Sequence, residues 1–323
     1  MIFLERSKSK KIALYEAFIR RSPSSDMNLD KIKVELSWLK SGMVGEERVD
    51  REWLDIHIQF PHVLLHGLIM ENSAGFTHQI DTVFICQHFI LVIEIKNYSG
   101  HIEFDENTHQ CIKKNAHGEV EGFHNPVDQV RRHRNFIRQI ILNLGYDLPI
   151  ESAVIFANSK SILGKVSFHD VLVFHVVGLR YKLNMLIEKH RKIILSKDEM
   201  ELIGHCLKTM RLNKEWIHNL NKDRLQKGVL CSKCFYSIVM QFHHGSFICP
   251  RCGNRDRKEL YDALDDFRLL WGEKISNREF MNYVGISSDK TALRLLKSLN
   301  LMFEGANRNR KYIIPSNIQN GNK

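Results

Sequence analysis

The chain has 323 residues, of which 43% are hydrophobic and 26% are charged, an ordinary balance for two or three globular domains. No apolar run approaches the roughly 18 to 20 residues that a membrane helix needs, and the first residues lack the pattern of a secretory signal. We therefore expect a cytoplasmic protein without membrane spans. The formal net charge of +10 favours a polyanionic partner such as nucleic acid, although a solvated basic surface is the alternative.

Five segments follow one another along the chain. A basic, helix-prone segment over 1–40, with a loop at 22–26, precedes a mixed region over 41–210. In the mixed region we expect strands near 62–69, 79–86, 89–97, 152–157 and 171–177, and helices near 45–57 and 126–144. Asn125 and Pro126 are suited to begin the second helix. Strands joined through a long helix predict an α/β domain with a mixed sheet.

Two charged residues end the strand "ILVIEIK". Alternate strand residues share a face, so Glu94 and Lys96 lie together at the end of a strand that begins apolar on both faces. A hairpin through residues 87–88 would place Asp81 opposite Glu94, and two carboxylates so close need a cation. Such hard oxygen ligands suit Mg²⁺ or Mn²⁺, and Lys96 could orient an attacking water. The alternative is a surface ion pair of Glu94 with Lys96, and an Asp81 that only caps a turn.

A third carboxylate lies on the helix expected near 45–57. Glu46, Val49, Asp50 and Trp53 fall at helical spacing, so Glu46 shares a face with two apolar residues. A carboxylate that faces inward usually has a partner. An exposed residue beside an irregular apolar stripe is the alternative.

Together these residues resemble a known family. The motifs are Gly42-x-x-Gly45-Glu46, Ile80-Asp81, Glu94-Ile95-Lys96-Asn97 followed by Gly100, and Asn125-Pro126-x-x-Gln129. Over about residues 40–155 the chain resembles the nuclease-related domain (NERD) family, which is similar to the PD-(D/E)XK restriction-endonuclease-like fold. One departure from that wider fold is Ile80, where a proline commonly precedes the aspartate.

The resemblance implies a metal-dependent nuclease core. In such a core Asp81 and Glu94 bind Mg²⁺ or Mn²⁺, and Lys96 assists the attacking water. Glu46 would contribute from its helix, and Gln129 would contact the substrate or brace the site.

The helix that carries Gln129 continues with a dense positive surface. Its basic residues are Arg131, Arg132, Arg134 and Arg138. Arginine suits bidentate phosphate contact, so these residues are candidate nucleic-acid ligands. A solvated helix face is the alternative.

Four cysteines follow a linker helix expected over 211–227. The pairs Cys231-x-x-Cys234 and Cys249-x-x-Cys252 are separated by 14 residues, and four thiolates on two tight turns can close a tetrahedral shell around Zn²⁺. We predict a structural zinc ribbon over 228–256, with His243 and His244 exposed at its hairpin tip. Four unligated thiols are the alternative.

The segment 257–323 is predicted to be a small α+β domain that resembles a winged helix. A capping box, Ser276-x-x-Glu279, begins one helix, and a second helix follows Gly285. From residue 228 to the end, 15 Lys and Arg stand against nine Asp and Glu. Candidate DNA contacts are Lys290, Arg294 and Lys297 on the second helix, and Arg308 and Arg310 on the wing. The alternative is a helical hairpin that packs on the nuclease core or mediates dimerisation.

The sequence therefore predicts a Mg²⁺-dependent enzyme that hydrolyses phosphodiester bonds of nucleic acid, with DNA as the first candidate. One alternative is a non-catalytic DNA-binding or regulatory protein that keeps the nuclease fold. Another is a scaffold whose zinc and helical modules bind protein.

Overall fold

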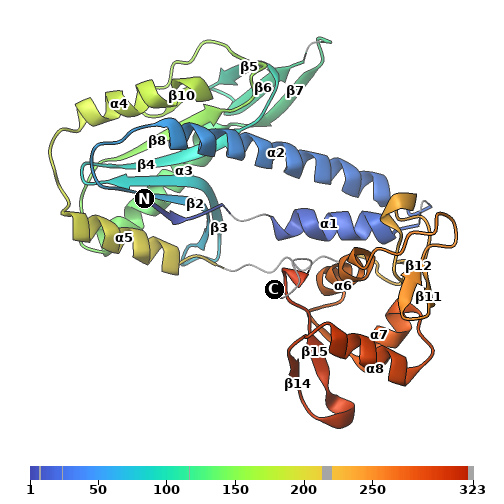
Figure 1. The fold of residues 1–323 in the computed structure, drawn as a ribbon. Helices are drawn as coiled ribbons and strands as arrows, with labels where there is room; N and C mark the ends of the chain where they lie inside the picture. Colours follow the sequence, from blue (N-terminus) through green and yellow to red (C-terminus); the bar gives the residue numbers. More distant parts are fainter. Residues whose placement is uncertain (7–8, 24, 116, 213–219, 319–323) are drawn as a thin grey trace. The chain divides into compact units, whose positions relative to one another are not determined.

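A computed structural model of the chain describes residues 1–6, 9–23, 25–115, 117–212 and 220–318. The chain divides into two compact units, one of residues 1–8 and 38–215, the other of residues 9–37 and 216–323. Figure 1 labels the helices and strands of both units. No helix of the described residues has the length and apolar composition that a bilayer-crossing segment requires.

The first unit is built on a six-stranded sheet with the order β1-β2-β3-β4-β8-β10. Its strands are β1 (Ile2–Leu4), β2 (His62–Glu71), β3 (Thr77–Cys86), β4 (Ile90–Lys96), β8 (Ile150–Phe156) and β10 (Leu172–His175). Strands β2, β3 and β4 pair antiparallel, whereas β1 with β2, β4 with β8, and β8 with β10 pair parallel. The predicted α/β fold with a mixed sheet is therefore confirmed.

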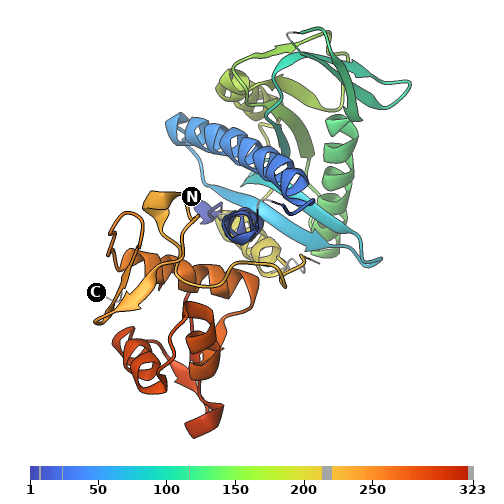
Figure 2. The ribbon, with the colours of Figure 1, turned by 90° about the vertical axis from the view of Figure 1, so that its right-hand side faces the viewer.

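Helices cover both faces of this sheet, so β4 is buried on both sides (Figure 2). On one face, α3 (Pro126–Asn143) and α5 (Lys197–Thr209) pack against a core that includes Val83, Val92 and Ile137. On the other face, the later part of α2 (Leu29–Asp55) and α4 (Leu179–Lys189) pack against Phe84 and Ile93. The apolar character of β4 on both faces follows from this three-layer arrangement.

A second sheet, which the sequence analysis did not predict, follows β4. Its order is β7-β6-β5-β9, from β5 (Gly100–Asp105), β6 (Gln110–Lys114), β7 (Val120–His124) and β9 (Ser161–Leu163). Gly100 turns the chain into it with φ +94°, and a Cβ there would lie 2.4 Å from the Lys114 carbonyl oxygen. Only glycine fits this turn without strain.

The N-terminal segment differs from its predicted form. It is not a separate basic helical segment: β1 joins the sheet of the first unit, and α1 (Lys10–Arg21) belongs to the second. Helix α2 begins at Leu29 rather than near residue 45. Gly42 and Gly45 weaken helix propensity, but both lie inside the helix and neither ends it. The break between the two helices lies where the Ser/Pro loop was expected.

Gly45 allows α2 to approach the end of β4. A Cβ at Gly45 would lie 2.6 Å from Cβ of Asn97, whose side chain is fixed by a hydrogen bond to the Ser41 carbonyl oxygen. At Gly42, one turn earlier, a Cβ would have no neighbour within 4 Å.

We expect Gly45→Ala to destabilise the protein by about 1–3 kcal/mol, because the new methyl group must displace Asn97. The matched control Gly42→Ala should stabilise it by about 0.5–1 kcal/mol, because alanine is the better helix former in an open position. Urea unfolding of both variants measures the difference. Equal effects of the two substitutions would contradict the close approach.

The second unit holds two small modules beside α1. A hairpin of β11 (Gln241–His243) and β12 (Ser246–Ile248) lies in the cysteine-rich segment. After it come α6 (Lys258–Leu270), β13 (Lys274–Ser276), α7 (Asn277–Val284), α8 (Asp289–Ser298), β14 (Phe303–Glu304) and β15 (Lys311–Ile313). The strands form a sheet in the order β13-β15-β14, and this helix-strand-helix-helix-strand-strand order is that of a winged helix.

A buried arginine links the parts of the second unit. Arg21 of α1 is 1% exposed, and its guanidinium bonds Asp266 of α6 and the carbonyl oxygens of Gln226 and Gly228. The predicted linker helix over 211–227 lies partly outside the described residues. Residues 211–212 and 220–227, which are described, form no helix.

Candidate functional site

The candidate active site begins where the β3–β4 hairpin opens. The register pairs Ile85 with Ile90 and Val83 with Val92, as the two-residue turn predicted. The backbone ladder ends at Thr82 and Ile93, and beyond it the Ile95 N–H donates to Oδ2 of Asp81 at 2.7 Å. The Asp81 carboxylate therefore takes the place of a strand partner at the end of β4.

Beside Asp81, the Lys96 side chain links Glu94 to Gln129. Lys96 Nζ donates to Glu94 Oε1 at 2.6 Å and to Gln129 Oε1, on α3, at 3.1 Å. The Glu94 side chain is only 3% exposed, and its second oxygen, Oε2, is buried without a hydrogen-bond partner. A buried carboxylate oxygen without a partner is costly, and a bound cation would satisfy it.

Glu46 has a partner that the sequence analysis missed. Arg6, just after β1, donates to Glu46 Oε2 at 2.7 Å, to both carboxylate oxygens of Asp50, and to Thr82 Oγ1 at 3.3 Å. His66 joins this group, with Nδ1 3.0 Å from Thr82 Oγ1 and 3.4 Å from Asp50 Oδ1. No local spacing signals these contacts, because the residues come from separate elements.

Burial and mutual repulsion raise the pKa of the three acids. Burial first, and then the Asp81 charge, raise the pKa of Glu94 to about 8, although Lys96 opposes the shift. The same two causes raise the pKa of Glu46 to about 7 against the effect of Arg6. Burial also raises the pKa of Asp81, which the Ile95 N–H opposes. Glu94, and in part Glu46, therefore hold a proton near neutral pH unless a cation replaces it.

Without added divalent ions, we expect the folding stability to fall as the pH rises from about 5 to about 8. Glu94 and Glu46 have higher pKa values in the folded protein than their ordinary value of 4.5, so the folded state binds more protons in this interval. Mn²⁺ or Mg²⁺ should reduce the decline by replacing the protons.

Thermal unfolding at pH 6 and pH 8.5 measures this dependence, with and without the ion. Glu94→Gln removes one of the two titrating groups and serves as the reference. The same pH dependence in wild type and Glu94→Gln would contradict the assignment.

The chemistry of the donor atoms at Asp81 and Glu94 suits a divalent ion. Both side chains supply hard oxygens, and Glu94 Oε2 lacks a hydrogen-bond partner. No third ligand side chain lies as close to both: in the described part of the chain, the cysteines alone form a group of three or more ligand side chains whose donor atoms lie within 4.8 Å of one another.

The four arginines of α3 divide into two pairs. Arg131 and Arg134 both bond the Asp170 carboxylate, at 2.6 Å and 3.2 Å, so an acidic residue already engages their guanidinium groups. Arg132 and Arg138 instead line an open hollow of about 1130 Å³, together with Gln129. Arg132 and Arg138 therefore border open space, whereas Arg131 and Arg134 are engaged by Asp170.

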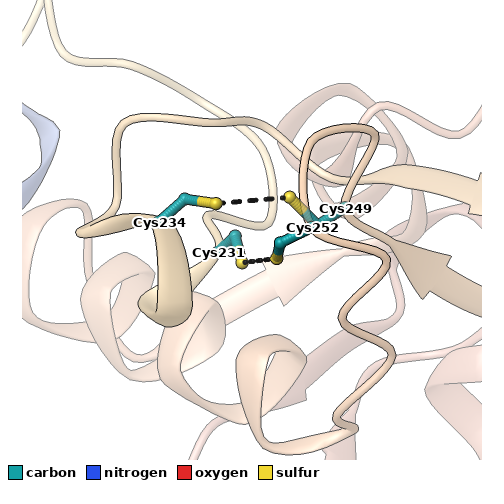
Figure 3. Close-up of side chains that lie close together, drawn as sticks. All are labelled: Cys231, Cys234, Cys249 and Cys252. Carbon is teal, nitrogen blue, oxygen red and sulfur yellow. Dashed lines mark hydrogen bonds between the residues drawn. The ribbon is translucent and has the colours of Figure 1, made fainter.

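The cysteine sulfurs gather in a group that fits zinc (Figure 3). Cys231 and Cys252 lie 3.6 Å apart between their sulfurs, and Cys234 and Cys249 lie 3.8 Å apart. A tetrahedral site with Zn–S bonds of about 2.3 Å has sulfur–sulfur edges of about 3.8 Å. The cluster is consistent with the predicted zinc ribbon.

A buried acid supports this cluster from α6. The Asn254 amide lies 3.7 Å from the Cys231 sulfur and donates to Glu259, which is 2% exposed. Glu259 also accepts hydrogen bonds from the backbone and hydroxyl of Ser232. His243 and His244 are exposed at the β11–β12 turn, as predicted.

The basic residues of the winged-helix module differ in exposure. Lys290, Arg294 and Lys297 are exposed on α8, whose opposite face buries Ala292 and Leu296. Arg310 lies over the Phe303 ring, 4.3 Å from its centroid, so the ring covers one side of its guanidinium. The side chain of Arg308 lies outside what the structure describes.

Comparison with known proteins confirms the family resemblance. Residues 41–157 match the family described as nuclease-related domain. A Bacillus anthracis protein described as uncharacterized is 29% identical over 170 residues, which cover 51% of this chain and 74% of that protein. The matched range includes the five residues of the candidate active site, which are Glu46, Asp81, Glu94, Lys96 and Gln129.

Proposed function

We propose that the nuclease-related domain of residues 41–157 hydrolyses phosphodiester bonds of nucleic acid with the help of a divalent cation, DNA being the first candidate substrate. One observation carries this proposal. Glu94 is buried beside Asp81, with one oxygen on Lys96 and the other without a partner. Buried acids with raised pKa values beside a basic helix are found more often at functional sites than elsewhere, which supports the proposal.

The contacts of each residue support a role in this reaction. A Mg²⁺ or Mn²⁺ ion held by Asp81 and Glu94 would polarise the phosphoryl group. The Lys96 ammonium, fixed between Glu94 and Gln129, is placed to orient the attacking water or to neutralise charge that develops on the phosphate. Gln129 positions Lys96 through its amide oxygen. Glu46 contributes negative charge from α2, and Arg6 holds it in place.

Incubation of the zinc-loaded full-length protein with nucleic acid tests the proposal. The substrates are plasmid, linear duplex, single-stranded DNA and RNA, each with Mg²⁺, with Mn²⁺, and with both ions omitted. We expect cleavage of at least one substrate that depends on the added ion. Intact substrates in every reaction would contradict catalysis.

A second candidate function is DNA binding without catalysis, which the exposed basic side of α8 favours. Lys290, Arg294 and Lys297 recur on that side, opposite the residues buried in the module. Helices α7 and α8 correspond to a helix-turn-helix, and the second helix of that motif, here α8, can enter the major groove.

If these three residues contact phosphates, replacing all three with glutamine should lower the slope of log affinity against log salt by about 2–3, because each contact contributes about 0.9. Fluorescence anisotropy with a labelled duplex over a salt series measures the slope. The control replaces three exposed basic residues of the first unit, Arg191, Lys192 and Lys197, with glutamine. A slope that only the control changes would place DNA binding elsewhere.

A further inference from the structure

His133 is a buried histidine that the roles above leave unused. It lies on α3 one turn after Gln129, on the face that also buries Val130 and Ile137. Its side chain is 7% exposed, and Nε2 has no hydrogen-bond partner. Nε2 lies 3.9 Å from Glu94 Oε2, which is also buried without a hydrogen-bond partner.

The distance between the two atoms is informative. It is too long for a hydrogen bond, so the histidine and the carboxylate leave each other unsatisfied. Two coordinate bonds of about 2.1 Å span about 3.0 Å at a right angle and about 3.4 Å at the tetrahedral angle, so an approach of less than about 1 Å would let one divalent ion bond both atoms. A histidine that served only to fill the core would not need to direct a bare ring nitrogen at a carboxylate.

The opposite side of the ring is held in place. His133 Nδ1 lies 3.2 Å from Nδ1 of His78, so one of these nitrogens donates to the other. His78 in turn stacks on Phe136, with ring centroids 4.1 Å apart and an interplanar angle of 8°. When Nδ1 of His133 carries the proton, Nε2 presents a lone pair toward Glu94. A second group that fixes the ring of a ligating histidine is usual in metal sites.

We propose that His133 supplies a nitrogen ligand to the divalent cation held by Glu94, and that the site therefore prefers Mn²⁺ or a similar transition ion to Mg²⁺. The inference rests on the proposed function, because it concerns the same cation. Imidazole suits transition ions, whereas Mg²⁺ prefers oxygen ligands. Beside the His133 nitrogen, Glu94 supplies one oxygen. Asp81, water or substrate oxygens would complete the coordination after a shift of the side chains, because the Asp81, Glu94 and His133 donors do not all lie within 4.8 Å of one another.

Electron paramagnetic resonance of the zinc-loaded full-length protein tests the ligand directly. Free Mn²⁺ is counted in a titration, Mg²⁺ affinity is obtained by competition, and the spin echo of bound Mn²⁺ is searched for ¹⁴N modulation. In wild type we expect ¹⁴N modulation and tighter binding of Mn²⁺ than of Mg²⁺. His133→Ala and His133→Asn should abolish the modulation and weaken Mn²⁺ binding at least about tenfold, with Mg²⁺ affinity within about threefold of wild type.

Two further variants separate the possible failures. His117→Ala, in an exposed loop, should behave as wild type and excludes modulation from a surface histidine. Glu94→Gln should lose both ions. Persistent ¹⁴N modulation and unchanged Mn²⁺ affinity in both His133 variants would overturn the ligand assignment alone. Equal loss of Mg²⁺ and Mn²⁺ in those variants would also overturn it, in favour of a packing role. Mn²⁺ that binds Glu94→Gln as it binds wild type would overturn the metal site and the proposed function with it.

Discussion

Glu94→Gln is expected to lower the rate of phosphodiester hydrolysis by at least about 10²- to 10³-fold, the usual loss when one preorganised electrostatic group is removed from an active site. Glutamine keeps the size of the side chain but removes its charge. In the wild-type protein the Lys96 ammonium lies 2.6 Å from Glu94 Oε1, and the substitution removes this anionic partner. Initial rates of cleavage at saturating Mn²⁺ or Mg²⁺ measure the effect.

A solvated pair of the same chemistry provides the control. Glu121 and Lys113 lie 2.8 Å apart, and the Glu121 side chain is 57% exposed. Glu121→Gln should change the rate less than about twofold, because an exposed ion pair contributes little. Circular dichroism establishes that both variants are folded. A folded Glu94→Gln protein that retains the wild-type rate would show that hydrolysis takes place at another site.

Replacing one clustered cysteine, as in Cys249→Ser, is expected to remove zinc and to unfold the segment 228–256 locally. Structural zinc contributes about 10–16 kcal/mol of apparent binding free energy in small zinc-finger peptides, and that binding is coupled to folding. The segment has only a short hairpin and a few buried side chains of its own, so it lacks the core to replace this contribution. Metal analysis and hydrogen exchange measure the two losses.

Cys206→Ser is the matched control, because Cys206 is partly buried and lies outside the cluster. We expect it to retain one zinc per chain and normal exchange over 228–256. Full zinc content in Cys249→Ser would be incompatible with a four-cysteine site.

Rules that concern residues close together in the sequence were sufficient to predict much of the first unit. The alternation of strand residues placed Glu94 and Lys96 on one face, and the two-residue turn fixed the pairing of Val83 with Val92. The residues expected to begin α3 do so, with Asn125 as the cap of its first turn. These predictions hold because each involves neighbours within one element or one tight hairpin.

Helix boundaries were less predictable where glycine lies inside a helix. The helix was expected near 45–57, but α2, which contains Gly42 and Gly45, begins at Leu29. Gly45 packs against Asn97, a role that helix propensity cannot reveal. The four-stranded sheet after β4 was missed because its strands are short and partly exposed, and therefore lack a clear apolar alternation.

The sequence by itself determined which chemical groups are available: the D…E-x-K residues at one strand end, the matched cysteine pairs and the basic side of α8. Only the tertiary structure decided which partners those groups have. Arg6 reaches Glu46 across 40 residues, Asp170 engages Arg131 across 39, and His133 faces Glu94 from another element. The physical reason is that periodicity fixes neighbours within a helix or strand, whereas contacts between distant segments depend on how the elements pack together.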